Sequence, residues 1–225
     1  LGSESFPNIL VGSDGCGEIV ELGSKVTTLK VGELVAINAA TDWPMNDASG
    51  IIPELTMIGE QINGTYCQDL ILDAGQVAKK PEHLSTTEAG VYGLTFLTAW
   101  RMIETLAKVR ENELVVVRGI GGGVALAALQ ICQAKKCRVA VTSRSEKKLQ
   151  KAKELGATFA YLQNDELVRT FRAEHQEGAD VVIDSVGAAT WLESIKMLRR
   201  GGRLTTCGAT TGPKPKTDIS RIFWN

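Results

Sequence analysis

The second half of the sequence alternates short apolar segments with segments of helical character, and this alternation restricts the fold more than any other feature. Five apolar segments after residue 112 are candidate strands: 114–117, 138–142, 159–162, 181–184 and 203–207. Helices are predicted between them, over 122–136, 145–155, 164–175 and 188–200. Near-continuous apolar strands separated by helices of this length are typical of a parallel sheet that is covered on both faces. We therefore predict a doubly wound α/β domain.

The first half has a different character, with short apolar runs broken by Gly, Asn and Pro at 17–23, 31–37 and 64–72. Such spacing is typical of an antiparallel, barrel-like β domain. Residues 38–63 lack a regular pattern, so we expect a long surface excursion there. We place the boundary between the two domains at 1–92 and 93–225.

A helix is predicted where the two domains join. Ser85 and Glu88 have the spacing of a capping box, in which each side chain accepts a backbone N–H group of the other residue. The following segment, 95–107, has the period of a helix with one buried face, made by Phe96, Leu97, Trp100, Ile103, Leu106 and Ala107.

A glycine-rich turn follows the first strand of the α/β domain and begins a helix. Residues 119–125 read GIGGGVA. Gly119 permits a tight turn, and a backbone without Cβ atoms at Gly121, Gly122 and Gly123 can approach a pyrophosphate closely. Since the spacing departs from a strict G-x-G-x-x-G, the prediction depends on the position of the turn after the first strand. We predict a Rossmann-type dinucleotide-binding domain, with these glycines and Val124 at the cofactor.

The end of the second strand indicates which dinucleotide is bound. Domains that prefer NAD usually end this strand in Asp or Glu, which binds the ribose hydroxyls, whereas this chain has Ser143 and Arg144, with Lys148 one helical turn further on. These three side chains can donate to a 2′-phosphate. The alternative is a solvated basic start of a helix, but cations are unfavourable at a helix N-terminus unless an anion is near. We therefore expect NADP(H), and the missing acid also disfavours a methyltransferase.

Two further strand ends are expected to face the same crevice, because ligands of open α/β sheets bind outside the carboxyl ends of the strands. They contribute Ser185 and Val186 after the fourth strand and Cys207 and Gly208 after the fifth. The small residues there leave room for a nicotinamide ribose.

Composition excludes several other classes of function. The net charge of the 225 residues is −1, and no concentrated basic and aromatic surface suggests a nucleic-acid partner. No apolar run approaches the roughly 20 residues of a membrane span, and the first residues do not have the pattern of a targeting peptide. We expect a cytoplasmic protein that acts on a small-molecule substrate, with neither nucleic acid nor membrane as a partner.

Four segments in this order resemble a known family: 11–17 (VGSDGCG), 94–100 (LTFLTAW), 119–125 and 201–204 (GGRL). Together they resemble the zinc-independent, quinone-oxidoreductase-like branch of the medium-chain dehydrogenase/reductase superfamily over essentially the whole chain. The resemblance implies a partial GroES-like β-barrel substrate domain before the Rossmann domain, with Thr98 near the nicotinamide. It also implies that full-length relatives are homodimers and that this sequence is truncated at both ends, without the last Rossmann strand.

The zinc ligands of zinc-dependent relatives have no counterpart here. Those relatives carry Gly-His-Glu where this chain has Gly12, Ser13 and Asp14, and a Cys near Leu94. Ser and Leu are not zinc ligands. The two histidines, His83 and His175, are expected on the surface, and the five cysteines form no C-x-x-C pair. We therefore predict no metal site, neither catalytic nor structural.

A site without zinc favours a conjugated acceptor, since no Lewis acid stabilises the charge on an alcohol or ketone oxygen. The sequence thus predicts an NADPH-dependent oxidoreductase acting on quinones, α,β-unsaturated carbonyls or similar activated alkenes. Ser13, Asp14 and Trp43 are candidates for lining the cleft, each equally explained by a structural role, so no catalytic residue is assigned. The alternative is a non-catalytic NADP(H)-binding protein that senses redox state or regulates partners.

Overall fold

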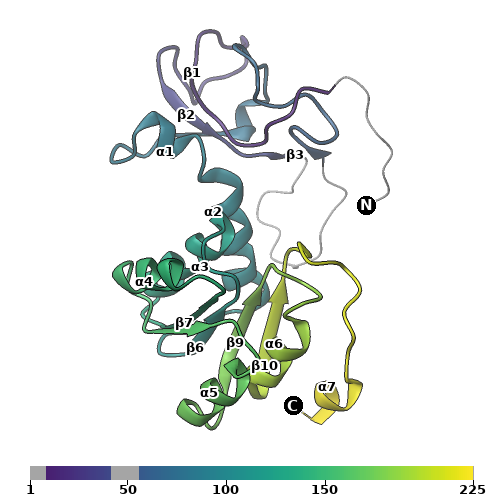
Figure 1. Ribbon diagram of the computed structural model, residues 1–225. Coiled ribbons are helices and arrows are strands. Elements are labelled where there is room, and N and C mark those ends of the chain that lie inside the picture. The colour runs from purple at the N-terminus through teal and green to yellow at the C-terminus, as the bar shows by residue number, and fades with distance from the viewer. Residues whose placement is uncertain (1–8, 42–55, 225) are drawn as a thin grey trace. The chain divides into compact units, whose positions relative to one another are not determined.

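The computed structural model describes residues 9–41 and 56–224 (Figure 1). The chain divides into two compact units, Leu1–Thr95 and Phe96–Asn225. Trp43, a candidate cleft residue, lies outside the described residues. Within the described ranges, no helix combines the length and apolar character that crossing a membrane requires.

The first unit is built from short antiparallel strands. β1 (Cys16–Glu18), β2 (Leu34–Ile37) and β5 (Val77–Lys79) form one sheet in the order β1-β2-β5, and β3 (Ala40–Thr41) pairs with β4 (Thr56–Met57). A 3₁₀ turn, η1 (Ala74–Gln76), precedes β5, and α1 (Thr86–Ala89) follows it.

The strand predicted at 64–72 does not form. The N–H groups of Gly64, Thr65 and Tyr66 instead donate to carbonyl oxygens of residues 10–12, at 2.7–3.0 Å. These bonds hold the beginning of the segment against a distant stretch of chain without a regular ladder, and Ile71 is almost fully exposed. The conformation of this segment is therefore determined by a long-range contact and not by its local sequence pattern.

The helix at the junction is present, but its buried face differs from the prediction. The capping box is confirmed, since Ser85 Oγ accepts the Glu88 N–H at 3.2 Å and Glu88 Oε2 accepts the Ser85 N–H at 2.8 Å. α2 (Gly93–Trp100) continues into η2 (Arg101–Leu106), which is a π-helix.

The prediction that Leu97, Trp100 and Leu106 are buried was wrong, because they are 43%, 55% and 44% exposed. Ile103 and Ala107 are buried in the core and Phe96 packs against it, as predicted, whereas Ala99 and Met102 complete the buried face without having been predicted. The N–H of Ala107 donates to the carbonyl of Met102, five residues earlier. This wider turn changes the period that the prediction assumed.

The second unit contains the predicted parallel sheet, in the order β10-β9-β6-β7-β8. Its strands are β6 (Leu114–Val117), β7 (Arg138–Ser143), β8 (Phe159–Leu162), β9 (Ala179–Asp184) and β10 (Leu198–Thr206). Its helices are α3 (Gly123–Ala134), α4 (Glu146–Glu154), α5 (Leu167–Glu174), α6 (Trp191–Met197) and α7 (Ile219–Trp224). The prediction of a doubly wound α/β fold is confirmed.

Hydrophobic cores cover both faces of this sheet. Along β6, Val115 and Val117 belong to the core that includes α3, whereas Leu114 and Val116 belong to the core that includes α5 and α6. Successive side chains of a strand point to opposite faces, so a strand buried on both faces needs an unbroken apolar run. This requirement explains the sequence LVVV in β6.

The last predicted helix is shorter than expected, and the strand after it is longer. α6 ends at Met197, β10 begins at Leu198, and the register of β10 against β9 shifts between Leu198 and Arg203. Gly201, just beyond the predicted end of this helix, has a positive φ of 67° and lies inside β10. A salt bridge of 2.6 Å from Arg199 Nε to Asp180 Oδ1 supports the polar start of β10.

Candidate functional site

The glycine-rich turn at the end of β6 has an open backbone at the start of α3. Gly119 and Gly121 have positive φ values of 68° and 118°, and a Cβ on Gly119 would lie 2.7 Å from Cγ2 of Val186. Gly122 is the N-cap of α3, and a Cβ there would meet nothing within 4 Å. The first N–H groups of a helix have no partner within the helix. Gly122, Gly123 and Val124 therefore present an uncovered helix N-terminus, which suits an anion.

Hydrogen bonds to both neighbouring strands fix this turn. The Arg118 N–H donates to the Ile183 carbonyl in β9 at 2.9 Å. On the other side, the Ile120 N–H donates to the Thr142 carbonyl in β7 at 2.8 Å, and the Gly119 N–H donates to Thr142 Oγ1 at 3.3 Å. The turn is therefore positioned relative to β7 and β9 and not only by its own glycines.

The residues predicted to bind a 2′-phosphate lie beside the turn. Ser143 ends β7, and its Oγ accepts the Ser145 N–H at 3.2 Å, so its own proton remains free to be donated. Arg144 is exposed, and Ser145 caps α4. The side chain of Lys148 lies over the glycine turn, with Nζ 3.2 Å from the position of a Cβ on Gly121. The Lys148 side chain therefore reaches from the first turn of α4 to the glycine turn.

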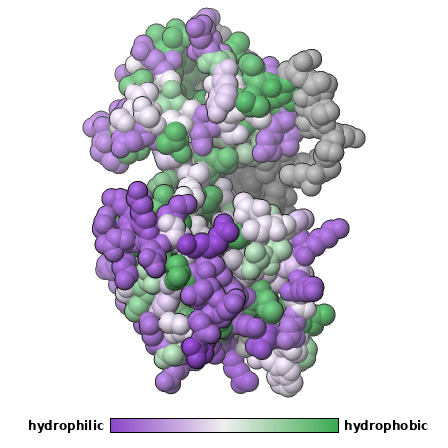
Figure 2. All heavy atoms as spheres, in the orientation of Figure 1, coloured by the Kyte–Doolittle hydropathy of each residue, from purple (hydrophilic) through white to green (hydrophobic). Residues whose placement is uncertain are grey.

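Positive charge is concentrated on this side of the unit. α4 carries Lys147, Lys148, Lys151 and Lys153, and Figure 2 shows hydrophilic residues gathered over α4. Lys151 pairs with Glu154 at 3.2 Å, whereas within the described part of the chain neither Arg144 nor Lys148 forms a salt bridge. These two cations are therefore available to a bound anion.

The ends of β9 and β10 are held together below the same edge of the sheet. The buried carboxylate of Asp184 accepts four hydrogen bonds, of 2.7–3.3 Å, from Val186 N–H, Gly187 N–H, Thr190 Oγ1 and Ser194 Oγ. A Cβ on Gly208 would lie 3.0 Å from the Ser185 carbonyl oxygen, so these two backbones are close. Cys207, next to Gly208, is exposed.

The structure thus brings the predicted residues on β6, β7, β9 and β10 to the carboxyl edge of one sheet. Thr98 is half-buried on α2, and its place near a nicotinamide is implied by family resemblance only. In the first unit, Asp14 Oδ1 accepts the Leu94 N–H at 2.6 Å, so this carboxylate caps the start of α2. This contact supports the structural interpretation of Asp14.

A polar network around the buried Arg118 adjoins the turn and was not predicted from the sequence. Arg118 is 0% exposed, and its Nη2 donates to Gln163 Oε1 at 2.7 Å and to Glu193 Oε2 at 2.5 Å. The position of an arginine between the apolar strand and the glycine turn could have indicated the network. Its partners could not be predicted, because they lie 45 and 75 residues further along the chain.

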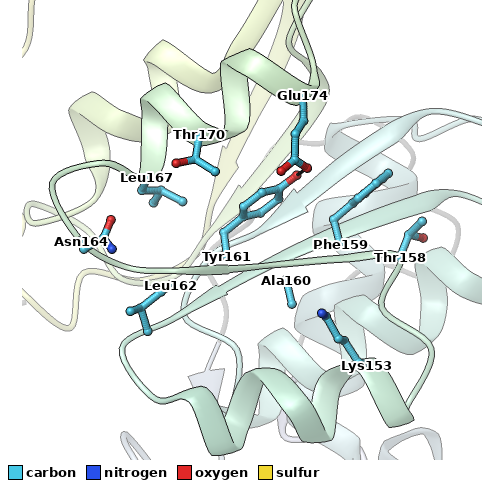
Figure 3. A pocket seen from close by; sticks show the side chains of 10 residues that line it. All are labelled: Lys153, Thr158, Phe159, Ala160, Tyr161, Leu162, Asn164, Leu167, Thr170 and Glu174. Carbon is cyan, nitrogen blue, oxygen red and sulfur yellow. Dashed lines mark hydrogen bonds between the residues drawn. The ribbon is translucent and has the colours of Figure 1, made fainter.

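A separate cavity of about 380 Å³ lies along the edge strand β8, between α4 and α5 (Figure 3). It is lined by Lys153, Thr158, Phe159, Ala160, Tyr161, Leu162, Asn164, Leu167, Thr170 and Glu174. None of the predicted cofactor residues belongs to this lining. The cavity is therefore distinct from the glycine turn and carries no part of the nucleotide site.

His175 is half-buried, so the predicted surface position holds only in part, because its ring also packs against two aromatic rings. Its ring lies 4.6 Å from that of Phe159 and 4.8 Å from that of Phe171. Tyr161 Oη donates to Glu174 Oε2 at 2.6 Å and lies 2.9 Å from His175 Nε2. Because the hydroxyl proton points to Glu174, we assign the hydrogen of neutral His175 to Nε2. Burial lowers the pKa of His175.

Within the residues that the structure describes, no three His, Cys, Asp or Glu side chains are grouped so that they can hold a metal ion. His83 is exposed, as predicted.

Comparison with known proteins identifies the family. Residues 2–82 match the alcohol dehydrogenase GroES-like domain, and residues 123–225 match the family described as zinc-binding dehydrogenase. The two matches follow each other as the β-rich unit and the parallel sheet do. The chain belongs to the medium-chain dehydrogenase/reductase superfamily.

Relatives of this superfamily align with most of the chain. A zinc-type alcohol dehydrogenase-like protein YogA of Leptosphaeria maculans is 32% identical over 89% of the chain and 60% of its own length. An NAD-dependent alcohol dehydrogenase structure is 33% identical, with a TM-score of 0.89 over 96% of this chain and 65% of its own. The structure of the 2-octenoyl-CoA carboxylase reductase CinF, in complex with NADP and 2-octenoyl-CoA, is 25% identical, with a TM-score of 0.85. The match covers 96% of this chain and 54% of CinF. The chain thus spans less than two thirds of each of these proteins.

Proposed function

We propose that this protein is an NADPH-dependent oxidoreductase that delivers hydride to a conjugated acceptor, a quinone or an α,β-unsaturated carbonyl, without zinc. The observation that carries the proposal is the position of Ser143, Arg144 and Lys148 beside the glycine turn, at the end of a strand without an acidic residue. A carboxylate at that position would repel a 2′-phosphate, whereas a guanidinium binds it with two parallel hydrogen bonds.

The residues of the chain fit NADP(H). The uncovered backbone of Gly122 at the start of α3 leaves space for a pyrophosphate. The hydroxyl of Ser143 and the cations Arg144 and Lys148, which form no salt bridge with the residues that the structure describes, suit the additional phosphate. The bound nicotinamide supplies the hydride, and the protein contributes binding and orientation. NADP in CinF supports this choice, whereas the description of another neighbour as NAD-dependent makes the choice worth testing directly.

A conjugated acceptor is the substrate class that these residues support. By the family resemblance, Ser13 stands where zinc-dependent relatives carry a histidine and Leu94 lies near the position of their cysteine, and neither side chain is a zinc ligand. In a conjugated acceptor, hydride adds to carbon and the negative charge is delocalised toward the carbonyl oxygen. The transition state therefore depends less on a Lewis acid for stabilisation of that charge. The 2-octenoyl-CoA bound to CinF belongs to this class.

Calorimetric titration with NADPH and NADH tests the cofactor. The wild type should prefer NADPH, and Arg144→Asp should abolish the preference, with a loss of roughly tenfold or more in NADPH affinity. Arg110→Asp is the matched control, because Arg110 is exposed at the opposite end of β6. Equal or tighter binding of NADH by the wild type would overturn the proposal.

Turnover with quinones and enones then tests the chemistry. NADPH oxidation that depends on such an acceptor would support the reductase. Tight NADPH binding without turnover of any acceptor would instead support the non-catalytic alternative, a protein that binds NADP(H) to sense redox state or to regulate partners.

A further inference from the structure

A network of polar side chains adjoins the glycine turn, made by the fully buried Arg118 and the half-buried Gln163 and Glu193. Besides the hydrogen bonds from Arg118 to Gln163 and Glu193, Gln163 Nε2 donates to Glu193 Oε2 at 2.8 Å. Arg118 Nη1 lies 3.1 Å from Met197 Sδ. Arg118 Nε has no partner among the described residues. One guanidinium therefore joins β6, the loop after β8 and α6.

Each member of this network is also attached to a different part of the candidate cofactor site. Arg118 directly precedes Gly119. The Gln163 N–H donates to the Ser143 carbonyl at 2.8 Å, next to Arg144. Glu193 precedes Ser194, whose hydroxyl donates to the carboxylate of Asp184 at 2.7 Å. That carboxylate accepts the Val186 N–H. The network thus connects the turn, the end of β7 and the end of β9.

Stability alone does not account for a charged group in this place. Desolvation of a guanidinium is costly, and well-packed apolar residues often replace a buried ion pair without loss. Arg118 also leaves its Nε unsatisfied, so the network is not optimised for stability. A guanidinium does, however, hold its partners in a rigid plane, which fixes their relative positions.

We propose that Arg118 is a positioning residue which, with Gln163 and Glu193, sets the separation between the glycine turn and the Ser143–Arg144 segment. This inference rests on the proposed function. A dinucleotide with a 2′-phosphate must reach both places at once, with its pyrophosphate at the turn and its additional phosphate at Arg144. The network therefore adds to the backbone hydrogen bonds between the turn and Thr142 in fixing this separation, and through it contributes to the preference for NADPH over NADH.

The test is the double variant Arg118→Met/Glu193→Leu, which removes both charges and leaves neither unpaired. Its matched control is Arg203→Met/Glu113→Leu, because Arg203 and Glu113 form a partly buried ion pair near the amino end of β6. NADPH and NADH affinities and the melting temperature are measured for both variants. We expect the NADPH-to-NADH preference to fall roughly tenfold in the network variant, and to stay within about twofold of the wild type in the control.

A preference that is unchanged in a folded network variant would overturn the inference. Amide hydrogen exchange separates this result from failure of the proposed function. If the wild type binds neither nucleotide, the proposed function fails, and exchange over 119–124 and 143–148 decides the positioning role. The positioning role is supported if these two segments exchange faster in the network variant than in a control variant of equal melting temperature. It is refuted if the two variants protect these segments equally.

Discussion

Substitution of Gly119 by alanine should destabilise the second unit, and the structure allows the effect to be worked out. The φ of 68° is a left-handed conformation, which costs a residue with a Cβ roughly 1–2 kcal/mol. The new methyl group would lie 2.7 Å from Val186 Cγ2, and turning that side chain off its rotamer costs about 0.5–1.5 kcal/mol. The lower entropy of the unfolded chain offsets roughly 0.4–1 kcal/mol. The net loss is about 2 kcal/mol.

Gly122→Ala is the control, because its φ of −94° suits alanine and nothing lies within 4 Å of the new Cβ. Its cost should stay below about 1 kcal/mol, from the weaker N-cap. Urea unfolding followed by circular dichroism should show a midpoint about 1 M lower for Gly119→Ala, for a slope of about 2 kcal/mol per molar urea. If the two variants are equally stable, the assumed strain and the contact with Val186 are wrong.

Two further substitutions test other parts of the second unit. Asp184→Ala leaves four donors without their acceptor, so urea unfolding should show a loss of at least about 3 kcal/mol; a loss below about 1 kcal/mol would contradict the role of this carboxylate. For His175, burial lowers the pKa below the ordinary 6.5, so its contribution to stability is complete above that value and is lost as the pH falls through the folded-state pKa. His175→Asn should therefore flatten the decline in the urea midpoint between about pH 7.5 and 5.5, and parallel declines in variant and wild type would exclude His175 as its source.

The elements that the sequence predicted best are those whose pattern is complete within one element. β6 and β8 have the predicted bounds, since each reads as a short apolar run with polar or turn residues around it. The capping box is equally local, because Ser85 and Glu88 are three residues apart and contact each other directly. Periodicity and capping require no knowledge of the rest of the chain.

Errors arose where a distant partner decides the local conformation. The beginning of 64–72 bonds to residues 10–12 and forms no strand. β10 begins five residues earlier than predicted, because Leu198 pairs with Ala179 across the sheet. The packing of the half-buried His175 depends on Phe159 and Phe171 on two different elements.

The sequence by itself determined the alternation of strands and helices along the second unit, the glycine turn and the basic end of its second strand, because these features depend on neighbours along the chain. Only the tertiary structure decided that Lys148 lies over Gly121, that Asp184 holds the end of β9, and that Arg118 is buried beside residues from the loop after β8 and from α6. The physical reason is that a parallel sheet collects the carboxyl ends of strands separated by whole helices. Side chains that meet at this edge are far apart in sequence, so no local pattern records their contacts.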